Sequence, residues 1–196
     1  IHAATAAKIA HKPVEEVTPL ERKKAKQANF GIIYGITTFG LSQRMGIDNK
    51  EAKQLIEGYF STYPKVKAYM NRAIEEAKKT GYAVTLFGRK RYLPDINSRN
   101  NTVRGFAERN ALNAPIQGSE ADIIKIAMIH IAERFEQEGI RSKMILQVHD
   151  ELNFSVLPEE KEKVERIVLE EMQNAYPLSV PLLADAGWGA NWLEAH

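Results

Sequence analysis

The chain has 196 residues, of which 44% are apolar, and it contains no cysteine. This length suffices for one core or two small subdomains, and the lack of cysteine excludes disulfides and thiolate metal sites. No apolar run approaches the roughly 18 residues of a membrane span, and no signal peptide is evident. We therefore expect no membrane partner and a cytoplasmic location.

The net charge of +2 conceals an uneven distribution. Residues 1–115 hold 20 Lys and Arg against 10 Asp and Glu, a net charge of +10, whereas residues 116–196 hold 7 against 15, a net charge of −8. A basic half suits phosphate backbones, and an acidic half suits metal binding. Solvated surface explains most of these charges individually.

The first half of the chain predicts successive helices. Residues 1–11 resemble the remnant of an Ala-rich helix. Thr18, Pro19 and Glu21 then form a helix start with a capping box, and this helix should end near Tyr34 because Gly35 follows it. Further helices are expected from Asp48 to about Tyr59, and from Pro64 to Gly81.

The second half predicts a mixture of strands and helices. Residues 82–93 are strand-like, with a turn at Gly88-Arg89, and a long helical pattern covers about 103–137. Residues 144–148 and 152–156 are typical of paired strands, Pro158 begins a helix, and a last strand is expected at about 180–185. The predicted fold class is therefore α+β and predominantly helical.

Residues 22–34 contain the first functional pattern. Arg22, Lys26, Phe30 and Tyr34 recur every fourth residue, and positions four apart on a helix lie on nearly the same face. Two cations and then two aromatic rings would extend over roughly 18 Å, at about 1.5 Å per residue. A nucleoside triphosphate has the same order, an anionic tail followed by a flat base.

The start of this helix is crowded with positive charge, contributed by Arg22, Lys23, Lys24 and Lys26. Cations there oppose the helix dipole and repel one another, whereas a bound anion would remove the conflict. On spacing alone, the alternative is a solvated basic start with Phe30 and Tyr34 in the core.

The second pattern is His149-Asp150-Glu151, which interrupts two β-rich runs. Asp is common at hairpin tips for reasons of turn geometry alone. The functional interpretation is that Asp150 binds a divalent metal, since phosphoryl transfer uses metal ions held partly by carboxylates. One Asp is insufficient, so a second carboxylate would have to come from elsewhere.

A third row, Arg109, Asn113 and Gln117, has the same four-residue spacing. It could contact minor-groove acceptors, which A·T and G·C pairs share, or it could be a polar face beside Pro115. Residues 89–91 (Arg-Lys-Arg) are either phosphate contacts or an exposed turn. Trp188 and Trp192 are interpreted as packing anchors rather than a base-stacking platform.

Together these rows resemble family A DNA polymerases. Residues 22–35 look like the helix motif of the fingers, and residues 147–151 look like the hairpin motif of the palm. Between them, residues 108–109 and 113–118 match the helix that contacts primer-template DNA. Ile1-His2 with Thr5-Ala6 resembles the start of the fingers. The match covers nearly the whole chain in the right order.

The resemblance implies a role for each matching position on the nucleotide side. Arg22 and Lys26 would hold the triphosphate, with Lys26 also a proton donor to the leaving pyrophosphate. His2 would touch the phosphate tail. Phe30 would pack on the incoming sugar and base and discriminate against dideoxy sugars, and Tyr34 would help to judge pair shape at the templating position.

The resemblance also assigns the DNA and metal contacts. Arg109, Asn113 and Gln117 would contact the primer-template, and His149 would lie near the primer end. Asp150 would bind Mg²⁺, one of two ions in the complete enzyme, with Glu151 in support. Residues 1–105 would be the fingers and residues 106–196 the C-terminal part of the palm.

The family's other catalytic Asp lies on a strand upstream of Ile1, and the thumb and any exonuclease domain would also be upstream. We therefore expect a polymerase of replication and repair whose 196-residue piece is inactive alone, and which self-associates through an open palm edge. One alternative is a catalytically dead nucleotide- or DNA-binding fragment. Another is a single-subunit RNA polymerase, against which Glu151 and the Phe30-Gly31-x-x-Tyr34 pattern count.

Overall fold

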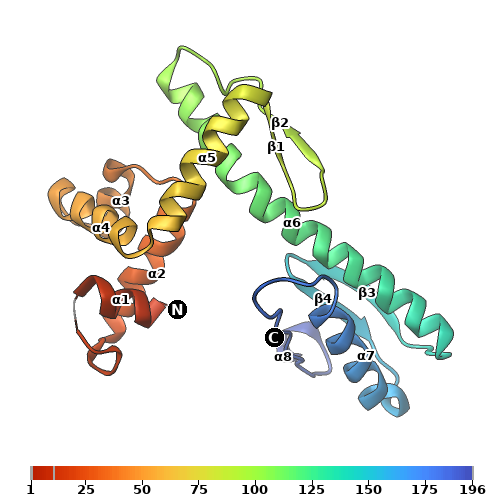
Figure 1. The fold of residues 1–196 in the computed structure, drawn as a ribbon. Coiled ribbons are helices and arrows are strands. Elements are labelled where there is room, and N and C mark those ends of the chain that lie inside the picture. Colours follow the sequence, from red (N-terminus) through yellow and green to blue (C-terminus); the bar gives the residue numbers. More distant parts are fainter. Residues whose placement is uncertain (1, 11, 196) are drawn as a thin grey trace. The chain divides into compact units, whose positions relative to one another are not determined.

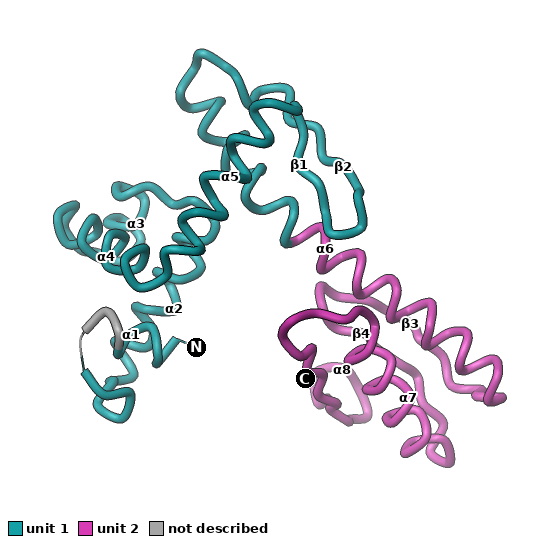
Figure 2. Tube along the Cα trace, viewed as in Figure 1, with its two compact units in different colours: residues 1–116 teal, residues 117–196 magenta. Residues whose placement is uncertain are grey.

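The computed structural model describes residues 2–10 and 12–195, with side chains for all of these except residues 8–10. The chain divides into two compact units, residues 1–116 and residues 117–196 (Figure 2). The boundary falls inside one long helix, α6 (Asn101–Gln137), which continues through Pro115. Among the described residues, no helix is both long and apolar enough to cross a membrane.

Unit 1 is mostly helical and carries one small β-hairpin beside the first half of α6 (Figure 1). Its elements before α6 are α1 (His2–Ala10), η1 (Val14–Glu16), α2 (Pro19–Ile33), α3 (Thr38–Met45), α4 (Asn49–Thr62), α5 (Pro64–Thr80), β1 (Tyr82–Val84) and β2 (Lys90–Tyr92). The antiparallel β1–β2 pair confirms the predicted hairpin, in which Gly88 takes a φ of 80° at the turn.

The start of α2 is fixed by the predicted capping box. The Glu21 amide donates to Thr18 Oγ1, and the Thr18 amide donates to Glu21 Oε2 at 2.8 Å. Lys12 Nζ also lies 2.7 Å from the Glu21 carboxylate. The hydrogen bond from Lys12, followed by those from Thr18, lowers the pKa of Glu21 to about 2. The Glu21 carboxylate therefore stays charged well below the usual pKa of Glu. Its stabilising effect on the helix start is lost only as the pH falls toward 2.

The sequence-based prediction passed over α3, although the segment has helix signals at both ends. The Thr37 hydroxyl accepts from the Gly40 amide at 3.0 Å and caps the helix. Gly46 ends it with a φ of 64°, a left-handed conformation that favours glycine. Eight residues between two other helices give too few turns for a clear apolar period.

Two small cores hold unit 1 together. In the first, Ala28 and Ile32 of α2 pack against Tyr59 of α4. The second lies between α5, the β-hairpin and α6, and it consists largely of alanines, including Ala77, Ala107 and Ala111. Small side chains allow these elements to approach closely, so the first half of α6 is anchored within unit 1.

Unit 2 is built on a second antiparallel hairpin, β3 (Lys143–Val148) and β4 (Glu151–Ser155), as predicted (Figure 1). η2 (Pro158–Glu160), α7 (Lys161–Gln173) and a short α8 (Trp192–Ala195) follow. Met144 and Phe154 of the hairpin pack with Ile131 of α6 and Ile167 of α7. One sheet face is thus covered by this core.

The strand predicted at about 180–185 is wrong. These residues form no strand, and in the described part of the chain β3 and β4 pair only with each other. Pro181 has no backbone N–H to donate to a ladder, which disfavours a strand there. The apolar residues around Pro181 suggested a strand, but no described strand pairs with this segment.

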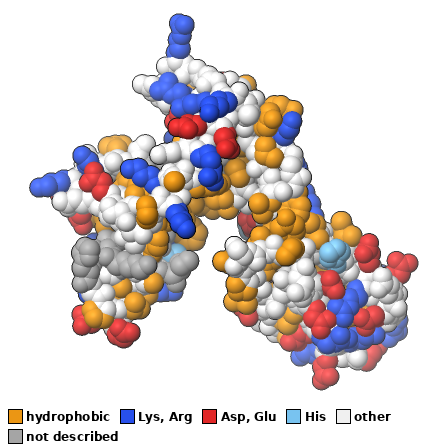
Figure 3. Space-filling model, in the orientation of Figure 1, with side chains coloured by type: hydrophobic (Ala, Val, Ile, Leu, Met, Phe, Trp, Pro, Cys, Tyr) orange, Lys and Arg blue, Asp and Glu red, His pale blue; other side chains and the backbone are white. Residues whose placement is uncertain are grey.

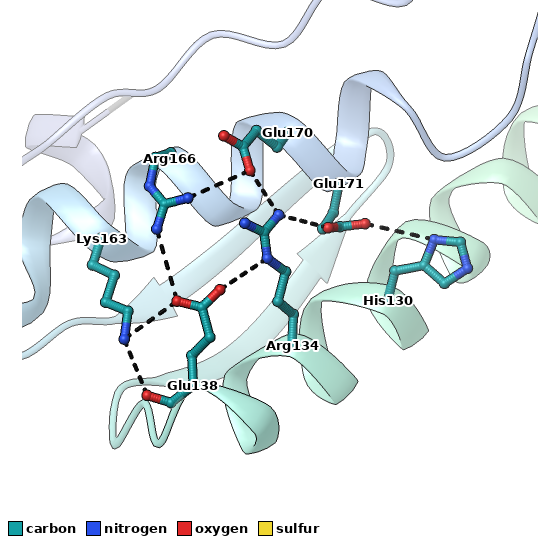
Figure 4. A network of polar contacts seen from close by, with 7 residues as sticks. All are labelled: His130, Arg134, Glu138, Lys163, Arg166, Glu170 and Glu171. Carbon is teal, nitrogen blue, oxygen red and sulfur yellow. Dashed lines mark hydrogen bonds and ion pairs between the residues drawn. The ribbon is translucent and has the colours of Figure 1, made fainter.

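An ion-pair network joins the end of α6 to α7 in unit 2 (Figure 4). Arg134 bonds to Glu171 at 2.8 Å, to Glu170 at 2.7 Å and to Glu138 at 3.0 Å. These hydrogen bonds, of which the one to Glu171 has the largest effect, raise the pKa of Arg134. Lys163 and Arg166 contact the other side of Glu138. The cations of this region are therefore used within the fold itself.

We predict different costs for two isoleucines on α6. Ile131 is fully buried, whereas Ile129 is 56% exposed. Ile131→Ala should lower the free energy of unfolding by about 2–5 kcal/mol, because it leaves a cavity. Ile129→Ala, the matched control, should change it by no more than about 0.5 kcal/mol. Chemical denaturation of the two variants measures the difference, and equal costs would contradict this description of the core.

Candidate functional site

The row on α2 lies on the exposed side of the helix. Its buried residues are Ala25, Ala28, Asn29, Gly31 and Ile32. Arg22 and Lys26 are exposed, and Phe30 is 44% exposed. The Phe30 and Tyr34 rings are stacked, with centroids 6.4 Å apart and planes 15° from parallel. Phe30 is therefore not a core residue, which decides against that alternative for it.

The positive charges of the row are not neutralised within the fold. Arg22, Lys23, Lys24 and Lys26 form no ion pair with any described residue, while Glu21 of the same turn pairs with Lys12 instead. Mutual repulsion and the helix dipole both disfavour such a cluster. An anion bound beside it would gain charge-assisted hydrogen bonds and relieve this conflict.

His2 of α1 joins the row from a neighbouring helix. Its ring centroid lies 5.6 Å from that of Phe30, at an interplanar angle of 49°. Burial, and then nearby positive charges that include Lys26 and Arg22, lower the pKa of His2. Since α1 packs along α2, three rings and two cations from separate segments form one surface.

Arg109 of α6 lies at the aromatic end of this surface. Gly35 follows α2 with a φ of 73°, and a Cβ there would lie 3.2 Å from Arg109 Cγ and 3.1 Å from Leu112 Cδ1. Only a glycine can make both this turn and this approach at low cost. The close contact brings the stem of Arg109 to the turn that ends α2, while its guanidinium lies 6.0 Å from the centre of the Phe106 ring.

The remaining members of the α6 row are placed differently. The Oδ1 atom of Asn113 is buried without a hydrogen-bond partner in the described structure. Gln117 is exposed and is the first residue of unit 2. The structure therefore brings Arg109 to the turn that ends α2, and Gln117 belongs to the other unit.

The His149-Asp150-Glu151 pattern forms the tip of the β3–β4 hairpin. His149 and Asp150 are the two turn residues, and His149 takes a φ of 53°. A positive φ at the first of two turn residues is typical of a type II′ turn, where glycine is preferred. Gln147 Nε2 donates to the His149 carbonyl at 2.9 Å. Asp150 is exposed at the tip.

Glu151 has a partner that the sequence did not indicate. Trp192 Nε1 donates to Glu151 Oε1 at 2.6 Å, and Trp188 Nε1 donates to Glu165 at 2.7 Å. Both tryptophans are more than a third exposed, so each orients a carboxylate rather than filling a core. No group of three or more potential metal ligands occurs among the described residues.

The candidate residues thus form two groups, one in each unit. Unit 1 holds His2, Arg22, Lys26, Phe30, Tyr34, Arg109 and Asn113. Unit 2 holds Gln117, His149, Asp150 and Glu151. The division of charge at the same point gives unit 1 a net +10 and unit 2 a net −8, because Ile116 is neutral. In Figure 3, Lys and Arg stand out over unit 1, while acidic and basic side chains are interleaved over unit 2.

Comparison with known proteins identifies the family. The family described as DNA polymerase family A matches residues 1–194. The chain is 50% identical over 195 residues to a DNA polymerase I from Geobacillus stearothermophilus and 48% identical over 195 residues to one from Bacillus subtilis. In both cases the match covers the whole chain and 22% of the relative. The chain belongs to DNA polymerase family A, and it spans about a fifth of the length of these relatives.

A solved structure agrees with this assignment and with the predicted fold class. It is described as the POL domain of Pol1 from M. smegmatis in complex with DNA primer-template and dNTP. It is 45% identical to the chain, with a TM-score of 0.95, and the match covers 99% of this chain and 34% of the other. The predominantly helical α+β fold is therefore confirmed, whereas the roles of individual residues stay predictions.

We predict that the turn at His149 is strained. His149→Gly should raise the free energy of unfolding by about 0.5–1 kcal/mol, since relief of a left-handed residue exceeds the added entropy of the unfolded chain. Asp150→Gly is the matched control, because Asp150 does not have a positive φ, and it should destabilise the chain. Thermal and chemical unfolding measure both, and a stabilising Asp150→Gly would contradict the turn assignment.

Proposed function

We propose that this chain is the part of a template-directed DNA polymerase that receives the incoming dNTP and carries one catalytic carboxylate of the palm. The observation that supports it best is the row of α2, where cations without an ion-pair partner among the described residues precede the exposed Phe30 ring, on which Tyr34 stacks. The parent protein would add dNTPs to a primer 3′ end by two-metal nucleotidyl transfer, in replication and repair. We retain the cytoplasm as its location.

The two ends of the α2 surface bind different parts of the nucleotide. Arg22 and Lys26 bind the triphosphate, and His2 contacts its tail. Lys26 also donates a proton to the leaving pyrophosphate, so its effect is on the chemical step as well as on binding. Phe30 packs on the sugar and base, and Tyr34 lies by the templating position. The exposure of Phe30 supports this assignment, since a stacking surface must be accessible.

The primer-template is the second partner in this proposal. Arg109, Asn113 and Gln117 contact the DNA, and His149 lies near the primer end. The position of Arg109 beside the end of α2 supports a contact near the templating base. The net charge of +10 on unit 1 suits a phosphate backbone, and binding should weaken as salt rises. The M. smegmatis structure was solved with DNA primer-template and dNTP, which supports both partners.

We propose that Asp150, supported by Glu151, binds Mg²⁺. An exposed carboxylate at a hairpin tip suits this ion, which takes one or two carboxylates and completes its shell with phosphate oxygens and water. When bound, the metal ion would stabilise the negative charge of the transferring phosphate. The hydrogen bond from Trp192 holds the Glu151 carboxylate beside the turn that carries Asp150.

The alternative is a nucleotide- or DNA-binding piece without catalysis. Our hypothesis is that the 196-residue chain alone does not extend a primer. The reaction uses two metal ions, and these ions need more carboxylate ligands than Asp150 and Glu151 supply. Primer extension with the purified chain, Mg²⁺ and all four dNTPs tests this. Template-dependent extension that disappears in Asp150→Ala would refute the hypothesis.

In the parent polymerase, two variants should separate chemistry from DNA binding. Asp150→Ala should abolish incorporation, since a ligand of the metal is lost. Lys26→Ala should lower the incorporation rate by about 10²–10⁴-fold, the range for general acid catalysis, with little change in duplex affinity. Lys50→Ala is the matched control, an exposed lysine in the first turn of α4.

Single-turnover incorporation and duplex binding are the measurements for these variants. If Lys26→Ala weakened duplex binding and left the incorporation rate unchanged, the assignment of the α2 row would be wrong. An equal loss of rate in Lys50→Ala would instead show that any cation of unit 1 has the same effect.

We also propose that the chain self-associates through the edge of the β3–β4 hairpin, with a second copy as the partner. Ile145 and Leu146 are 63% and 47% exposed there, and exposed strand edges recruit other strands. Light scattering over a dilution series should show a mass that falls on dilution. Leu146→Lys should weaken association, whereas Leu20→Lys, at another exposed leucine, should not. A dilution-insensitive monomer would contradict the proposal.

A further inference from the structure

Asn29 is the one polar side chain among the buried residues of α2. It lies three residues after Lys26, so it flanks the Arg22–Tyr34 row at the border of the buried face. Only 7% of it is exposed. A buried amide is costly unless it is hydrogen-bonded, so its contacts should explain its presence. No role is assigned to it by the sequence patterns described above.

Both N–H groups of the Asn29 amide point toward α1. Asn29 Nδ2 lies 3.0 Å from His2 Nδ1 and donates to Thr5 Oγ1 at 3.1 Å. Thr5 Oγ1 in turn lies 3.2 Å from the Tyr63 hydroxyl. The Asn29 Oδ1 atom has no hydrogen-bond partner among the described residues. The amide is therefore oriented by its two donors, one of which it directs at the imidazole.

In this contact the amide nitrogen of Asn29, which can only donate, faces His2 Nδ1. A nitrogen that accepts a hydrogen bond carries no proton, so in the neutral imidazole the proton must be on Nε2. Lys26 and Arg22 lie close enough to oppose a second proton on the ring. The Nε2–H donor thus belongs to the same surface as these cations and Phe30, whose ring lies 5.6 Å from that of His2.

We propose that Asn29 is a positioning residue, which fixes His2 in the Nε2–H form and so presents a donor to the phosphate tail of the incoming nucleoside triphosphate. The inference rests on the proposed function, in which His2 contacts that tail. Asn29 itself touches no substrate and acts through the histidine, as second partners of functional histidines do in other sites. The competing explanation is that Asn29 serves only to join α1 to α2.

The first test is the tautomer of His2 in this chain, read from long-range ¹H–¹⁵N correlation spectra of the ring above its pKa. The proposal expects a protonated Nε2 and an unprotonated Nδ1. Asn29→Asp, which replaces the donor by an acceptor of the same shape, should move the proton to Nδ1 or give the doubly protonated ring. A proton on Nδ1 in the unmodified chain would overturn the proposal.

Thr5→Val is the matched control. It removes the other hydrogen bond of the Asn29 amide at a site that is 2% exposed, and it keeps the shape of the side chain. The control should lower the unfolding midpoint and leave the His2 tautomer unchanged. If Thr5→Val altered the tautomer as much as Asn29→Asp does, the amide would not specifically position the ring.

The second test uses the parent polymerase and the Michaelis constant for dNTP. Asn29→Leu should raise it about tenfold, the loss expected for one hydrogen bond to a charged group, and Thr5→Val should not. In a His2→Gln background, Asn29→Leu should have no further effect if it acts through His2. A full additional loss in that background would overturn the proposal.

A negative result in each of the two tests rejects a different hypothesis. With the Nε2–H tautomer present, a His2→Gln variant of unchanged dNTP affinity would show that His2 does not contact the phosphate tail. That result would reject this part of the proposed function, and with it the donor role inferred here. An Nδ1–H ring would reject the Asn29 contact and leave the remaining α2 assignments untouched.

Discussion

The packing of one face of α2 against α1 and α4 is the constraint on which the candidate nucleotide surface depends. Ala28 and Ile32 meet Tyr59 in the core, so the helix has only one rotational setting. With about 3.6 residues per turn, that setting exposes Arg22, Lys26 and Phe30 together. Gly35 then allows α6 to approach the end of the helix. The arrangement of the exposed row is therefore a consequence of which small residues are buried behind it.

One cation cluster in each unit is used in a different way. In unit 2, Arg134, Lys163 and Arg166 are shared among the carboxylates of α6 and α7, and such partly exposed pairs contribute modestly to stability. On α2 of unit 1, the four cations near the helix start have no acidic partner among the described residues. Their positive potential is directed at solvent, where an anion can meet it. The sequence half with the excess of positive charge thus also contains this cluster, although Lys12, Lys78 and Arg104 of the same half are ion-paired.

Local signals in the sequence were sufficient for most of the fold. The capping box at Thr18, the Pro64 and Gly81 boundaries of α5, and both hairpins depend on neighbouring residues, and all of them were predicted. α3 was missed because it is too short for a clear period, and the strand at 180–185 was wrong because a strand needs a distant partner. The face shared by Arg22, Lys26 and Phe30 followed from spacing alone. Its contacts with His2 and Arg109 involve segments far apart in the chain, and spacing cannot supply those.

Contacts between distant segments also explain why the residues that orient His2 and Glu151 were not predicted from the sequence. Asn29 is paired with His2 across 27 positions, and Trp192 is paired with Glu151 across 41. The two pairs differ in their surroundings, since Asn29 is 7% exposed and Trp192 is 48% exposed. Water can replace the indole donor at Glu151, so its loss leaves the carboxylate solvated. Water has little access to Asn29, and a polar group that loses its partner in a buried setting incurs the full cost of desolvation. The orientation of His2 is therefore tied to the core of unit 1, whereas that of Glu151 depends on an exposed contact.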